Sequence, residues 1–159
     1  MKSFRLLLAA ALLCAGAFAQ PRPDFSGTWK LNAGKSAQDG AAEKGYTVTI
    51  EHSGATIKLT TKAEGVTNIF DGTFKIDGKP HIVKRGKANY RFTKVGWEAG
   101  NTLTFEITDK DSTKETAKVT FYVRQTWTLS PDQKVLTEFR RTAEVAKPIA
   151  DRKYVFDKQ

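Results

Sequence analysis

Cysteine is almost absent from this sequence: the only one, Cys14, lies in an apolar run near the start of the chain. A single cysteine cannot form an internal disulfide, so burial of apolar surface must stabilise the folded domain. Thiolate metal sites and cysteine-based redox chemistry are excluded for the same reason. Bacterial lipid attachment needs a small residue before the cysteine, whereas Leu13 stands there, so we expect no lipid anchor.

Histidine is equally scarce, and the two present, His52 and His81, stand far apart without a metal-binding spacing. A zinc site needs three or four suitably placed ligands, so we predict no metal and no cofactor. The sequence also lacks a Gly-x-Ser-x-Gly elbow and a glycine-rich phosphate loop. Asp109-Lys110-Asp111 lacks the glycine and closing glutamate of a calcium loop. We therefore expect no catalytic residues and no enzyme activity.

Long apolar runs are confined to the beginning of the chain. Lys2 and Arg5 precede the run Leu6–Gly16, and Ala17-Phe18-Ala19 places small residues where signal peptidase requires them. We predict a cleaved signal peptide at 1–19, an extended leader at 20–24, a single domain at 25–159, and a periplasmic or secreted location. No later run approaches the roughly 20 apolar residues that span a bilayer, so we predict no membrane span.

Period-2 alternation of apolar and polar residues dominates from Asp24 onward, with turn residues every eight to twelve positions or so. Asp77-Gly78 and Ser130-Pro131-Asp132-Gln133 are the clearest turns. The pattern predicts about eight to ten strands and no helix beyond one turn at 41–44. Eleven segments are candidates for these strands: 25–31, 46–51, 55–60, 66–70, 72–76, 81–85, 88–95, 101–108, 114–129, 134–142 and 152–157.

Each expected strand has one apolar and one polar face, and no helix is available to cover the apolar side. Such a sheet must close on itself or fold into two layers. Short sequential connections favour an antiparallel up-and-down β-barrel, which has room inside for side chains or one small ligand. Alternation assigns the candidate ligand-binding residues to the inner face: Tyr90, Phe92, Phe105, Phe121, Gln125, Trp127 and Phe139.

Gln125 stands out because it lies between Val123 and Trp127 on an apolar face, where an unpaired amide costs about 1–3 kcal/mol. Two interpretations remain open. The amide bonds a neighbouring backbone group or a buried water, or it provides a polar contact inside a ligand cavity. The aromatic residues are equally open to two interpretations, as core packing or as cavity lining.

The opening strand contains Gly27-Thr28-Trp29, which resembles the Gly-x-Trp strand shared by lipocalins and fatty-acid-binding proteins. The resemblance implies that Gly27 lets a neighbouring backbone approach and that Trp29 plugs the closed end of the barrel. In lipocalins an arginine from a late strand covers this tryptophan. Arg141, expected on the face of Phe139, is the first candidate for that role, and Arg152 is the second.

A closer resemblance is to exported lipocalin-like proteins of environmental bacteria, an uncharacterised subfamily. It rests on the opening strand, on a hairpin like 127–132 and on the ending Tyr154-Val155-Phe156. Two features depart from the better-known families. The segment 32–45 is too short and polar for the two-helix lid of fatty-acid-binding proteins, and the C-terminal helix and disulfides of many lipocalins are missing.

The chain is basic, with a formal net charge of +9, which falls to +7 when Lys2 and Arg5 are removed. The densest basic stretch, 84–87, precedes Tyr90, Arg91 and Phe92, but alternation separates these rings from the charge of Arg91. We therefore interpret this stretch as a solvated outer face and predict no nucleic-acid partner.

Two functional hypotheses follow. The first is a monomeric barrel that binds a small apolar or amphipathic molecule, for which the positive charge would suit an anionic head group. The alternative is a packed β domain without a ligand cavity that serves as a structural or protein-interaction module. An isomerase of hydrophobic substrates ranks third, since no acid–base pair is identifiable.

Overall fold

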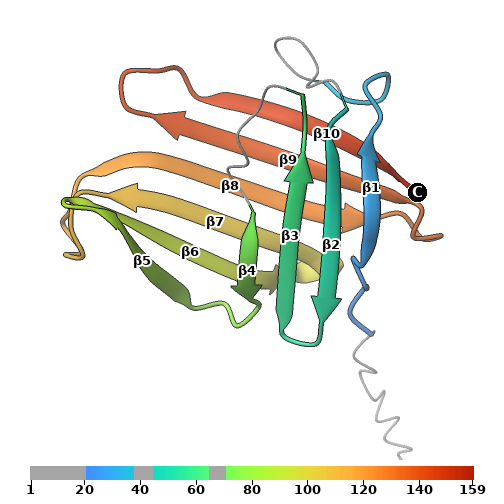
Figure 1. Ribbon diagram of the computed structural model, residues 1–159, viewed down its shortest axis with the longest axis horizontal. Helices are drawn as coiled ribbons and strands as arrows, with labels where there is room; N and C mark the ends of the chain where they lie inside the picture. The colour runs from blue at the N-terminus through green and yellow to red at the C-terminus, as the bar shows by residue number, and fades with distance from the viewer. Residues whose placement is uncertain (1–20, 38–44, 65–70) are drawn as a thin grey trace, which may run out of the picture.

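The computed structural model describes residues 21–37, 45–64 and 71–159 (Figure 1). The predicted signal peptide at 1–19, the helical turn at 41–44 and the strand at 66–70 lie outside the described residues. The described elements are β1 Gly27–Leu31, β2 Thr47–Ser53, β3 Thr56–Lys62, β4 Gly72–Lys75, β5 Pro80–Gly86, β6 Asn89–Glu98, the 3-10 turn η1 Ala99–Asn101, β7 Thr102–Lys110, β8 Val119–Leu129, β9 Val135–Glu144 and β10 Ala150–Lys158.

Ten strands form one antiparallel sheet in the order β4-β3-β2-β1-β10-β9-β8-β7-β6-β5. Every neighbour in this order is also a neighbour along the chain, except that β1 pairs with β10, where Trp29 lies opposite Lys158. The sheet curls, so that β1–β4 cross steeply over β6–β9 (Figure 1). The predicted antiparallel, up-and-down all-β fold is confirmed.

The curled sheet is an incomplete barrel, because β4 and β5 share no ladder in the part of the chain that the structure describes. A single parallel bridge between Ile76 and Val95 brings the end of β4 against β6. The Gly78 N–H donates to the Val95 carbonyl at 2.8 Å. Asp77-Gly78 forms the predicted turn, with Gly78 at φ 67°. The end of β4 and the following turn therefore contact β6, while the sheet stays open between β4 and β5.

Trp29 is fully buried where β1 pairs with β2 and β10. Its Nε1–H donates to the Phe25 carbonyl at 2.9 Å, and the Lys158 Nζ lies 5.1 Å from its ring centroid. The cation over the tryptophan is therefore a lysine of β10. The prediction that Arg141 covers Trp29 is wrong: its side chain is 61% exposed and forms a two-pronged ion pair with Asp151.

Gly27 permits this arrangement for a reason that differs from the predicted one. A Cβ at Gly27 would lie 2.7 Å from Cε of Lys158, so the glycine accommodates a side chain rather than a neighbouring backbone. Its φ of 136° also lies in the region that favours glycine.

Candidate functional site

The inner face of the curled sheet is defined by cross-strand register. Val95, Phe105, Gln125, Arg140 and Arg152 lie directly opposite one another on the five neighbouring strands β6 to β10. Because directly opposed residues share a face, they form one row across the sheet. We call this the central row. Val95, Phe105 and Gln125 are each at most 2% exposed, so the row faces the interior.

Aromatic side chains flank the central row and join the two halves of the sheet. The rings of Phe105 and Trp127 lie 4.7 Å apart between centroids. Phe74 of β4 meets Phe105 edge to face at 5.9 Å, and Phe25 lies 6.2 Å from Trp127. Trp127 is 3% exposed, and its buried Nε1 has no hydrogen-bond partner among the described residues. The apolar wall thus contains an unused donor.

A buried ion pair lies beside this wall. Glu138, 1% exposed, accepts a hydrogen bond from Nε of Arg140 at 2.6 Å, and the Arg140 guanidinium lies 4.6 Å from the Tyr154 ring centroid. Burial disfavours the charged guanidinium, but the Glu138 carboxylate together with Tyr46 and Tyr154 outweighs this effect and raises the pKa of Arg140. Arg140 is therefore positively charged at neutral pH. A buried charge of this kind requires a partner.

Arg152 adds a further cation to the central row. It lies opposite Arg140 on β10, and its Nε is buried without a hydrogen-bond partner in the described part of the chain. No ion pair joins Arg152 to a described residue, whereas Glu138 already bonds Arg140. The charge of Arg152 is therefore not balanced by any of the residues that the structure describes.

A second ion pair lies near the end of the inner face. Arg91 of β6 donates two hydrogen bonds of 2.7 Å to Asp109 of β7. Their side chains are 16% and 11% exposed. Phe121 of β8 lies opposite Asp109, and the Arg91 guanidinium is 6.0 Å from its ring. The inner face thus has charged pairs on both sides of its apolar wall.

A pocket of about 210 Å³ lies between β4, β5 and β6. Phe74, which contacts Phe105, forms part of its wall. On β5, His81 lies opposite Thr93 and Val83 lies opposite Arg91. Because directly opposed residues share a face, His81 and Val83 belong to the inner face of β5. The complete lining is Thr73, Phe74, Lys75, His81, Val83, Thr93 and Val95.

Four predicted site residues lie on the inner face as expected: Phe105, Phe121, Gln125 and Trp127. Tyr90 and Phe92 do not. Phe92 lies opposite Thr108, and the Lys110 Nζ is 5.2 Å from its ring, on the outer face. The inner residues of β6 are the odd-numbered ones, and they include Arg91. Arg91 can be buried on the inner face because Asp109 neutralises its charge.

Phe139 also lies on the outer face, where it is 53% exposed and 5.8 Å from the Lys153 Nζ. The assignment of Phe139 and Arg141 to the inner face of β9 is therefore wrong. The inner residues are Leu136, Glu138 and Arg140, and the two charged ones are buried together as a pair.

Sequence reasoning thus did not assign six of these inner-face residues to the ligand site: Phe74, Arg91, Asp109, Glu138, Arg140 and Arg152. One signal could have found Arg91, since Val95 and Trp97 share its parity and continue its strand to Glu98. Among the described residues, no cluster of three or more metal-ligating side chains occurs. The described chain also has no helix long and apolar enough to cross a membrane.

No protein-family model matches this chain, and no curated protein matches it in sequence. One solved structure that it matches is zebrafish ileal bile acid-binding protein in complex with cholic acid. The two are 18% identical, the match covers 85% of this chain and 98% of the other, and the TM-score is 0.48.

Proposed function

We propose that this chain binds one small amphipathic anion on its inner face. The observation that carries the proposal is the central row, in which an apolar wall at Phe105 adjoins Gln125, Arg140 and Arg152 on successive strands. Ligand sites in proteins combine mostly apolar walls with a few placed polar groups, and this row has that composition. The apolar body of a ligand would contact the aromatic rings.

The anionic preference rests on charge. Glu138 neutralises Arg140 of the central row, whereas no described residue pairs with Arg152, the next member of the row. A guanidinium without a protein partner favours a carboxylate, sulfonate or phosphate, which can accept its hydrogen bonds. The unused Nε1–H of Trp127 offers one further donor to such a ligand.

Two probes of nearly equal shape test this proposal: anilinonaphthalene sulfonate and the uncharged N-phenylnaphthylamine. Both fluoresce more strongly when they leave water. We expect the protein to bind the sulfonate more tightly than the amine. Arg152→Met should weaken sulfonate binding about tenfold, equivalent to about 1.4 kcal/mol, and leave amine binding nearly unchanged.

The matched control is Arg141→Met, which removes the same charge from the outer face of the neighbouring strand. Sulfonate affinity should not change in this variant. If the folded protein binds neither probe, the inner face is a packed core and the alternative of a structural or interaction module is favoured. Equal losses in both variants would mean that only the overall charge matters.

We further propose that the binding protein is an exported, lipocalin-like barrel that acts outside the cytoplasm. The proposal rests on the signal-peptide pattern at 1–19 and on the Gly27-Thr28-Trp29 strand. Expression in a bacterial host with export machinery, followed by intact-mass measurement of the periplasmic fraction, tests it. We expect a chain that begins at Gln20; full-length protein in the cytoplasm would argue against export.

A further inference from the structure

Exposed apolar side chains gather at one end of the molecule. Six large apolar residues are exposed in the described part of the chain. Phe139 lies on the outer face of the sheet, and the other five lie in β5 or beside the β7–β8 and β9–β10 connections: Ile82, Val83, Val119, Val145 and Ile149. Alternate connections of an antiparallel meander lie at the same end of the sheet. The β5–β6, β7–β8 and β9–β10 connections therefore all lie at this end (Figure 1).

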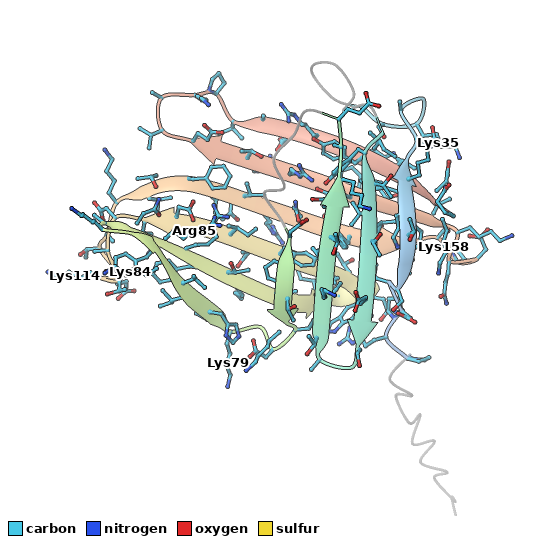
Figure 2. All side chains as sticks on the ribbon, viewed as in Figure 1. Lys35, Lys79, Lys84, Arg85, Lys114 and Lys158 are labelled. Carbon is cyan, nitrogen blue, oxygen red and sulfur yellow. The ribbon has the colours of Figure 1, made fainter. Side chains whose placement is uncertain are left out.

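The same end is strongly basic. Figure 2 shows Lys84, Arg85 and Lys114 together at this end, far from Lys35 and Lys158. We define the basic end as residues 82–87, 110–119 and 144–149. It contains seven lysines and arginines against three acidic residues, a net charge of +4. Among its basic side chains, only Lys147 forms an ion pair with a described residue.

Each segment of the basic end places an exposed apolar residue beside or close to a basic one. Val83, which is 60% exposed, precedes Lys84 and Arg85 directly. In the next connection Lys118 adjoins Val119. In the third, Lys147 stands between Val145 and Ile149, which are 54% and 66% exposed. Exposed aliphatic groups are unfavourable in water, so their concentration within a cationic surface indicates a binding surface.

We propose that the basic end docks on the surface of an anionic phospholipid bilayer. Lysine and arginine side chains would contact lipid phosphates, while the aliphatic side chains enter the boundary between head groups and acyl chains. A bilayer fits better than an acidic protein or a nucleic acid, because the aliphatic groups stand on separate connections. A fluid surface can accept them independently. Docking requires no ligand on the inner face.

Co-sedimentation with vesicles tests this proposal in the full chain. We expect sedimentation with phosphatidylglycerol–phosphatidylcholine vesicles and little with phosphatidylcholine alone. The triple variant Lys84→Gln, Arg85→Gln, Lys114→Gln should reduce binding at least tenfold, since each basic residue near an anionic surface adds to the affinity. All variants retain residues 1–20, so any contribution of that apolar run is common to them.

The matched control removes three exposed lysines from β1, β3 and the β4–β5 turn: Lys30→Gln, Lys62→Gln and Lys79→Gln. Its vesicle binding should fall less than twofold. A second variant, Val145→Ser with Ile149→Ser, keeps the charge and should reduce binding at least threefold. It separates insertion of aliphatic groups from charge attraction.

Three results would overturn the proposal: no sedimentation with anionic vesicles, equal binding to neutral vesicles, or equal losses in the test and control triples. Titration of the protein and the test triple with duplex DNA provides a further comparison. If the test triple loses DNA binding while vesicle binding is unchanged, the surface serves nucleic acid instead. Sulfonate-probe binding measured in every variant reports on the inner face and its fold, so failure of docking is distinguishable from failure of the proposed ligand binding.

Discussion

Trp29 shows how one residue of the opening strand depends on the last strand. Its ring is fully buried, its Nε1–H is satisfied by Phe25, and Lys158 lies over it. The sequence predicted the burial of Trp29 correctly, since the Gly-x-Trp resemblance implies a plug at the closed end. It did not identify the covering cation, because that depends on the register between β1 and β10.

Truncation of Trp29 to alanine should destabilise the protein by about 3–5 kcal/mol, because it leaves a large cavity in the core. Urea denaturation followed by circular dichroism measures this change. Phe139→Ala serves as the control, since Phe139 is exposed on the outer face and should change stability by at most about 0.5 kcal/mol. A Trp29→Ala protein that unfolds at the same urea concentration as the wild type would contradict the assigned role.

The buried pair of Glu138 and Arg140 gives a second prediction at this scale. Glu138→Gln keeps the shape of the side chain but leaves the Arg140 charge without its carboxylate, which should cost about 3–5 kcal/mol. The double variant Glu138→Leu, Arg140→Met should recover most of that loss. Thermal unfolding of both variants provides the comparison, and equal melting temperatures would show that the pair is not coupled.

At the scale of the strand, alternation predicted elements better than it predicted faces. On β7 and β8 the inner residues are mainly apolar, and the predicted faces are correct. On β9 the inner positions of Glu138 and Arg140 are polar, whereas Phe139 is outside. A period-2 pattern cannot identify the inner face when charged residues neutralise each other there. The register and pairing that permit this arise only in the folded sheet.

The contact between β6 and the β4–β5 turn yields a prediction for these elements. A Cβ at Gly96 would lie 3.2 Å from the Gly78 Cα, so Gly96→Ala should push the turn away from β6. We expect faster amide exchange at Gly78, whose N–H bonds the Val95 carbonyl. Gly86→Ala is the control, because a Cβ at Gly86 would meet no other atom within 4 Å. Unchanged exchange at Gly78 would mean that the contact does not hold the turn.

For the whole molecule, the number, direction and order of strands were accessible from turn spacing and alternation. The opening between β4 and β5 was not, because closure depends on how far a ten-stranded sheet curls. That curvature results from twist and packing accumulated over all strands. The polar residues of the inner face could not be predicted either, because alternation does not show which charged residues neutralise each other inside the sheet.

Loss of the final strand should abolish the fold. Deletion of residues 154–159 removes three buried side chains, Tyr154, Val155 and Phe156, and the pairing of β1 with β10. We expect no cooperative thermal transition by circular dichroism. A chain that begins at Asp24 lacks the predicted signal peptide and most of the leader, and should melt within a few degrees of the wild type. A cooperative transition in the C-terminal deletion would show that β10 is dispensable.

The pairing of β1 with β10 also determines when, during synthesis of the chain, the sheet can first form in full. Val48 and Leu136, both buried in the common core, belong to halves of the sheet that are joined through strands from opposite ends of the polypeptide. The ladder between β1 and β10 therefore forms only after β10 has been synthesised, so the hairpins of β1–β4 cannot be joined to the rest of the sheet through it before that point.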